Sequence, residues 1–215
     1  MIGRKPRLNP LRWLLPAIAI AVAMPPAWAG TEEDYAAGEK AYRAGDVTSA
    51  MSHLRKAADA GHGKAQARLA EILDASDYNE EAFAYYRKSA DQGDVDGVFG
   101  LASMYAVGEG TKKDPAEAYK LYVLAVEKGH PQAYMVIASA YIFGQLGIDE
   151  ARRNSEEATR WLKLAADRDF LPAVEALAKA YKTGGFGVAP DAQQAADWDA
   201  KLKKLRKDGG AAKKP

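Results

Sequence analysis

The chain has 215 residues, enough for one domain with a buried core, and its 48% hydrophobic and 27% charged residues are typical of a globular protein. It contains no cysteine, which excludes disulfides, thiolate nucleophiles and cysteine metal sites. Alanine is abundant and β-branched runs are scarce, so the composition predicts an all-α fold, because alanine favours helices and lets them approach closely.

The first 29 residues have the order of a secretory signal peptide. A basic segment without acids precedes an apolar run from Trp13 to Met24, and small residues, Ala27 and Ala29, flank Trp28. We therefore expect cleavage between Ala29 and Gly30 and export to the periplasm or out of the cell. A retained membrane anchor is the alternative, but this run is shorter than the about 20 apolar residues that a span needs.

Charge is distributed unevenly after this segment. Residues 30–200 carry 19 basic and 28 acidic residues, whereas residues 201–215 carry seven basic residues and one acid. An acidic body does not suit a nucleic-acid groove, which needs a basic stripe. The basic end, residues 208–215, is expected to be a disordered, solvated tail.

Small residues recur at related spacings and predict a repeat of two helices. One track lies 32, 36, 40 and 37 residues apart and marks the second helix of each unit, called helix B: Ala50, Ala82, Ala118, Ala158 and Ala195. Another marks the first helix, called helix A: Ala65, Gly97, Ala133 and Ala173. Apolar residues four, five and eight positions later complete one buried stripe of helix A.

The turn between the two helices has its own pattern. Glycine stands three residues after a tyrosine, where a helix ends in a left-handed residue, at Gly45, Gly108, Gly144 and Gly184. Polar residues four positions before the helix B alanine are expected to cap that helix: Asp46, Asp114, Asn154 and Asp191. Glu117, Glu157 and Gln194 would complete capping boxes. The length differences fall in this turn, so insertions should project at one edge.

Residues 102–110 with 114–118, residues 154–166 and residues 181–198 resemble the Sel-one-like repeat, a relative of the tetratricopeptide repeat. The resemblance covers about residues 33–207. It implies a right-handed solenoid of about five helix–turn–helix units, near residues 33–61, 62–93, 94–129, 130–169 and 170–207. It also implies adaptor or scaffold work, often in bacterial envelopes, with different partners from member to member.

The remaining chemistry gives no catalytic, cofactor or metal site. His62 and His130 follow repeat-ending glycines and are interpreted as turn residues, and His53 as a residue between repeats. Histidine spacing typical of zinc is absent from the sequence. The two glycine-rich stretches of the sequence, residues 108–110 and 183–187, coincide with the predicted turns. Neither of them ends in the Lys-Ser/Thr that is typical of a phosphate-binding loop.

One face of helix A is predicted to bind a partner. Positions opposite the buried stripe are apolar or small in two repeats and basic in the next, and the predicted site comprises Phe99, Ser103, Met135, Ser139, Ile142, Lys179 and Lys182. The alternative is that Phe99 and Met135 pack against the neighbouring repeat.

These patterns predict an exported scaffold that binds other proteins and has no catalytic activity of its own. We expect its partners to be envelope proteins. Two alternatives remain open at this point. The chain could be an accessory subunit or regulator of an envelope enzyme acting on peptidoglycan or exopolysaccharide. It could also be a membrane-tethered adaptor if the signal segment is retained.

Overall fold

The computed structural model describes residues 26–211, with side chains from 30 to 208, and within this range it contains eleven helices and no strand. The helices are α1 (Pro26–Arg43), α2 (Val47–Asp59), α3 (Gly63–Asp74), α4 (Asn79–Asp91), α5 (Val95–Val107), α6 (Pro115–Glu127), α7 (Ala133–Phe143), α8 (Glu150–Arg153), α9 (Glu156–Ala166), α10 (Leu171–Thr183) and α11 (Ala192–Ala211). The all-α prediction is confirmed.

The predicted domain boundaries stay predictions, because parts of both ends lie outside the described residues. Most of the proposed signal segment lies outside them, and α1, beginning at Pro26, runs across the expected cleavage point. At the other end, α11 continues to Ala211, into the segment expected to be a disordered tail. Its Leu202 and Leu205 pack against the last part of the core, which extends the helix beyond the repeat pattern.

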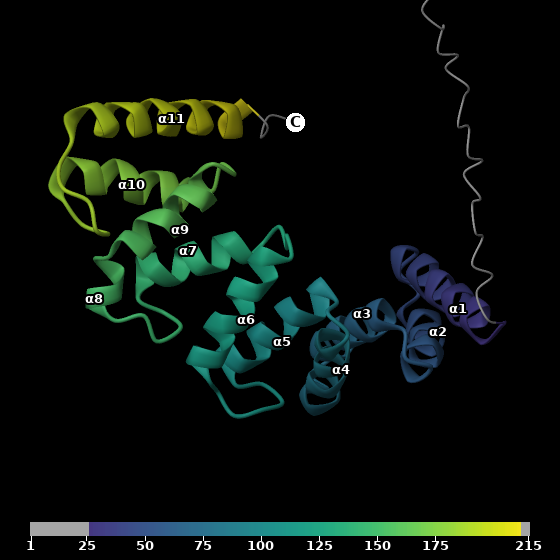
Figure 1. Ribbon diagram of the computed structural model, residues 1–215. Helices are drawn as coiled ribbons and strands as arrows, with labels where there is room; N and C mark the ends of the chain where they lie inside the picture. Colours follow the sequence, from purple (N-terminus) through teal and green to yellow (C-terminus); the bar gives the residue numbers. More distant parts are fainter. Residues whose placement is uncertain (1–25, 212–215) are drawn as a thin grey trace, which may run out of the picture.

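The helices form five antiparallel pairs that follow one another along a curved path (Figure 1). Helices A are α1, α3, α5, α7 and α10, and helices B are α2, α4, α6, α9 and α11, while the short α8 lies in the turn of repeat 4. Two pairs of neighbouring helices A contact each other directly, α3 with α5 and α7 with α10. Helices B instead contact helix A of their own and of the next repeat, which places helices A on the inner side of the curve.

The alanine tracks form the core. Ala50, Ala82, Ala118 and Ala158 are fully buried, and so are Ala65, Ala133 and Ala173 of helices A. Ala138 of the same stripe is also fully buried, beside Tyr141. The register predicted for both helices is therefore confirmed.

The turn glycines adopt the predicted left-handed conformation, with φ of 80° at Gly45, 93° at Gly108, 67° at Gly144 and 85° at Gly184. Repeat 2 has no glycine there, and Asp77 takes the left-handed role with φ of 63°. Aspartate is one of the few other residues that tolerate this region.

Three of the four predicted helix caps are confirmed, and one is wrong. Asp46, Asp114 and Asp191 each accept a hydrogen bond at 3.0 Å from the amide three residues later. Asn154 does not cap α9, because Ser155 accepts the bond from the Ala158 amide. The side chain of Asn154 instead accepts a hydrogen bond at 3.2 Å from the Phe186 amide of the next repeat. Glu157 consequently does not form the predicted capping box.

The long turns of repeats 3 to 5 reach back over the preceding repeat. A Cβ at Gly110, in the turn of residues 108–114, would overlap with the carbonyl of Asn79 at the start of α4. A Cβ at Gly187, in the turn of residues 184–191, would overlap with the carbonyl of Ser155 at the start of α9. The insertions therefore lie at one edge, as predicted, and two of them need glycine for close backbone approach.

Candidate partner-binding site

A hollow of about 330 Å³ lies on the inner face and crosses four repeats. We call it the inner hollow. Its walls come from α1, α3, α4, α5 and the chain entering α7, and it is lined by Tyr35, Lys64, Ala67, Arg68, Glu71, Tyr86, Asp96, Phe99, Gly100, His130 and Gln132. Helices A thus build a continuous concave surface from residues far apart in sequence.

Aromatic rings form the apolar part of the inner hollow. Phe99 is half-buried and stacks on His130 with ring centroids 3.9 Å apart. Its edge also meets Tyr122, at 5.4 Å between centroids. Phe99 therefore lines the hollow and also packs between repeats 3 and 4. The two interpretations of Phe99, as a partner-binding residue and as packing between repeats, each describe part of its environment.

The position of the Tyr86 ring depends on a glycine in the neighbouring helix. A Cβ at Gly100 of α5 would overlap with the Tyr86 ring, so the ring lies directly against the helix backbone. Burial raises the pKa of Tyr86, and the carboxylates of Asp74 and Glu71 raise it further. The hydroxyl therefore remains protonated and can donate a hydrogen bond to a ligand in the hollow.

Charged groups in the inner hollow differ in how well they are paired. Arg68 donates to Glu39 at 2.6 Å and also bonds Glu71. Lys64 is exposed and has no ion-pair partner among residues 30–208. An anionic group entering the hollow would meet this ammonium group.

His130 is buried, although the sequence suggested only a turn role. Its Nδ1 accepts a hydrogen bond at 3.3 Å from the Gln132 amide, and its Nε2 lies 3.6 Å from Asp96. Burial lowers the pKa of His130, and Asp96 partly offsets this effect. The ring is therefore neutral near pH 7 and acts as an aromatic wall.

The predicted site residues do not all line one surface. Phe99 lines the inner hollow, whereas Lys179 lines another hollow of about 310 Å³ near the turn of repeat 5. Lys182 pairs with Asp199 at 2.7 Å, and Ile142 packs against the core of repeats 4 and 5. Ser103, Met135 and Ser139 are half-buried on α5 and α7. Their role in binding a partner stays a prediction.

Lys64, Tyr86 and His130 were missed as site residues. Lys64 and Tyr86 lie on the two helices of repeat 2 and His130 lies between repeats 3 and 4, and a pattern within one repeat cannot bring all three together. The one available signal was Gly100, since a glycine inside a helix weakens it and often marks the close approach of another group.

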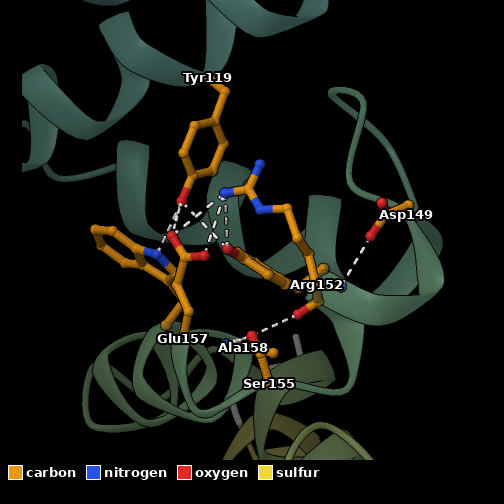
Figure 2. Close-up of polar contacts among 8 residues, drawn as sticks. Tyr119, Asp149, Arg152, Ser155, Glu157 and Ala158 are labelled. Atoms are coloured by element: carbon orange, nitrogen blue, oxygen red, sulfur yellow. Dashed lines mark hydrogen bonds and ion pairs between the residues drawn. The ribbon is translucent and has the colours of Figure 1, made fainter.

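A polar cluster joins repeats 3 and 4 (Figure 2). Tyr119 donates to Glu157 at 2.6 Å and lies 3.2 Å from the Tyr141 hydroxyl, while Trp161 donates to Tyr119 at 3.2 Å. Arg152 of α8 binds Glu157 at 3.2 Å and lies over the Tyr119 ring. We call these five residues the tyrosine cluster, and it anchors the inserted α8 to the solenoid.

The tyrosine cluster keeps Glu157 ionised. Burial alone would raise the pKa of Glu157, but hydrogen bonds from Tyr119, Tyr141 and Arg152, with the charge of Arg152, lower it below its ordinary value. Burial and the bond to Glu157 raise the pKa of Tyr119. The phenol therefore stays protonated and the carboxylate stays charged, which favours a fixed structural bridge over proton transfer.

Metal-site groups and membrane-spanning helices are both absent from the described residues. Within residues 26–211, no group of three or more histidine, cysteine or carboxylate side chains has the arrangement of a metal site. None of the helices in that range is both long and apolar enough to span a bilayer.

The comparisons with known proteins agree with the repeat boundaries. The family model described as Sel1 repeat matches residues 35–62, 63–94, 95–130, 131–170 and 172–198. The chain is 26% identical to a chitin synthase regulator of Saccharomyces cerevisiae, over 69% of the chain and 23% of that protein. It is 31% identical to an uncharacterised Neisseria meningitidis protein, over 58% of the chain and 26% of that protein. The chain thus spans about a quarter of the length of these relatives.

Solved structures show the same fold. A protective antigen present in uropathogenic Escherichia coli strains superposes with a TM-score of 0.71 at 24% identity, covering 83% of this chain and 39% of that one. A Sel1 repeat protein from Oxalobacter formigenes superposes with a TM-score of 0.62 at 26% identity, covering 81% of this chain and 73% of the other. The helical repeat solenoid is therefore supported independently of the sequence tracks.

Proposed function

The chain belongs to the Sel1 repeat family, and from this premise we propose that it is an exported scaffold that binds a segment of a partner protein in the inner hollow. Proteins of this family generally mediate protein–protein interactions. A scaffold needs a concave, partly apolar surface with a few polar groups left open to a ligand. Catalysis by the chain itself is not part of this proposal.

The inner hollow is the observation that carries the proposal. It extends across helices A of three repeats to the chain entering α7, so a bound segment would contact several repeats at once. Phe99 and Tyr86 supply apolar surface, and Lys64 supplies a cation with no ion-pair partner among residues 30–208. A peptide with an apolar side chain and a nearby carboxylate matches these groups.

Regulation of an envelope enzyme is the second candidate. It is favoured by one observation, that a relative is by name a regulator of chitin synthase. On this proposal, the partner held in the inner hollow would be an enzyme of peptidoglycan or exopolysaccharide synthesis. Adding the purified chain to such an enzyme should then change its rate, whereas a plain scaffold would leave the rate unchanged.

Export is also a proposal, and it is supported by the order of residues 1–29. Protein expressed with its own leader should be recovered from the periplasm with an intact mass that corresponds to a start at Gly30. Recovery of uncut chain in the membrane fraction would instead support the tethered adaptor.

A charge reversal in the inner hollow tests the scaffold proposal. Lys64→Glu should weaken capture of partners from an envelope extract by about tenfold or more, because it removes the unpaired cation that lines the inner hollow and repels an acidic segment. Lys56→Glu, an exposed change on α2, is the matched control and should capture like the parent. Both variants should keep the melting transition of the parent. Equal capture by Lys64→Glu and the parent would contradict this site.

A further inference from the structure

A second hollow lies at the edge of the solenoid, between the turn of repeat 3 and the turn of repeat 4. It has a volume of about 470 Å³, and no residue lines both it and the inner hollow. Val107, Pro115, Tyr122, Val136 and Leu146 form its apolar walls. We call it the edge hollow.

Apolar side chains are unusually exposed around the edge hollow. Val107 is 56% exposed and Phe143 is 66% exposed. They occupy equivalent positions, each at the last residue of a helix A and directly before the turn glycine. Two adjacent repeats therefore present apolar groups to solvent at the same edge, which is typical of an interaction surface.

The edge hollow is open because the turn of repeat 4 is not held against the preceding helix. In repeat 5, the Phe186 amide donates to Asn154 and the Phe186 carbonyl accepts from Thr159. The equivalent residues one repeat earlier, Asp114 and Tyr119, are engaged elsewhere. Asp114 caps α6, and Tyr119 bonds Glu157 in the tyrosine cluster.

Leu146 is half-buried and packs against the core cluster that includes Tyr122 of α6, whereas Gly147 is exposed. A Cβ at Gly147 would lie 3.9 Å from the nearest atom, on Pro115, in contrast to the overlaps at Gly110 and Gly187. Leu146 is held at φ of 53°, a conformation that costs a non-glycine residue on the order of 1 kcal/mol. This strained residue forms one wall of the edge hollow.

The rim of the edge hollow is cationic. Lys113 lines it and Lys112 precedes it, and both are exposed without an ion-pair partner among residues 30–208. Arg153, at the place equivalent to Lys113 one repeat later, instead donates to the carbonyls of Tyr141 and Ile142, at 3.0 and 2.8 Å.

The next junction differs in its chemistry as well. Its hollow of about 310 Å³ is lined by the charged residues Glu150, Arg153 and Lys179. The combination of apolar walls with unpaired lysines thus distinguishes the junction of repeats 3 and 4 from the next one.

We propose that the edge hollow docks a segment of a partner protein that inserts one apolar side chain between Val107 and Leu146 and directs carboxylates to Lys112 and Lys113. The apolar walls fit the anchor, and the charge of the rim selects an acidic sequence around it. The inference rests on the proposed role as a scaffold but assigns a binding surface separate from the inner hollow.

The test uses a phage library of random peptides, selected on the chain from Gly30 to Pro215, with the affinity of the enriched peptides measured by fluorescence anisotropy. We expect enrichment of sequences with an aliphatic or aromatic residue beside Asp or Glu. Val107→Ser should weaken binding of these peptides by about tenfold, and the double variant Lys112→Glu/Lys113→Glu should do the same. Val47→Ser, at a 45% exposed valine on α2, is the matched control and should bind like the parent.

Both sets of variants lie at exposed positions, so their melting transitions should match that of the parent. Enrichment of basic peptides, no enrichment, or peptides insensitive to Val107→Ser would overturn the proposal. If the selected peptides are lost with Lys64→Glu and retained by Val107→Ser, the inner hollow binds and the edge hollow does not. That result would leave the scaffold function standing.

Discussion

The turn of repeat 4, residues 144–149, and the turn of repeat 5, residues 184–191, share a backbone device but pack differently. Each contains a non-glycine residue and then a glycine with positive φ, Leu146–Gly147 at 53° and 70° and Phe186–Gly187 at 51° and 80°. Two consecutive left-handed residues reverse the chain tightly. The turn of repeat 5 is bonded to Asn154 and Thr159, whereas the turn of repeat 4 leaves the edge hollow beneath it.

The difference shows that the preceding repeat decides where an inserted turn lies. Asn154 can hold the turn of repeat 5 because Ser155 caps α9 in its place. Asp114 must cap α6 itself, and Tyr119 is committed to the tyrosine cluster. Two turns of similar local conformation are therefore bonded to the preceding repeat in one case and border a candidate binding surface in the other.

The largest expected effect distinguishes the two turn glycines. Gly187→Ala should destabilise the fold by about 3 kcal/mol or more, because the added Cβ overlaps with the Ser155 backbone as well as straining the turn. Gly147→Ala, whose added Cβ would make only an ordinary contact with Pro115, should cost only about 1–2 kcal/mol from the left-handed conformation. Urea denaturation of both variants measures the difference. Similar losses would show that the turn of repeat 5 is not tightly docked.

The next effect concerns the cluster that occupies Tyr119. Glu157→Ala should cost about 2 kcal/mol, because it removes the common acceptor of Tyr119 and Arg152 and leaves them incompletely paired. Glu156→Ala, at the exposed neighbouring position, is the control and should stay within about 0.5 kcal/mol of the parent. Equal stability of the two variants would mean that the tyrosine cluster does not hold α8.

A smaller effect should make the turn of repeat 5 resemble the turn of repeat 4, which has no such hydrogen bond to the preceding repeat among the described residues. Asn154→Ala removes the hydrogen bond to the Phe186 amide and should cost about 1 kcal/mol. Hydrogen exchange at that amide should become faster while exchange in the middle of α9 is unchanged. Unchanged exchange at Phe186 would indicate that backbone packing at Gly187 alone holds the turn.

The smallest effect is a pH dependence. Because the folded pKa of Glu157 is lowered from its ordinary 4.5, its ionised form stabilises the fold above about pH 4.5, and this contribution is lost as pH falls through the lowered value. The stability advantage of the parent over Glu157→Gln should therefore shrink in acid, by no more than about 1 kcal/mol since the side chain is 36% exposed. An advantage that grows in acid would contradict the ionised bridge.

Much of the architecture could be predicted from the sequence, because it depends on short-range periodicity. The tracks of small residues placed helix B of every repeat and helix A of repeats 2 to 5, and the glycines placed the turns of every repeat except repeat 2. The packing of the turns against the preceding repeats could not be predicted. Gly187 lies against Ser155 of another repeat, and the number of residues between successive turn glycines varies, so no fixed spacing signals this contact. Glu157 fitted a capping box by position, yet Tyr119 and Arg152 bind it across the junction. The inner hollow could not be predicted for the same reason, because Lys64 and His130 come to line one surface only in the folded chain.

The local character of these contacts also has a consequence for how the chain folds. Among the described residues, the side-chain hydrogen bond with the largest sequence separation joins Trp161 to Tyr119, only 42 positions apart. Chains dominated by such short-range contacts have low contact order and fold quickly, because little loop-closure entropy precedes each gain in packing. Each repeat can therefore assemble on its predecessor as soon as it emerges from the ribosome, without waiting for the far end of the chain.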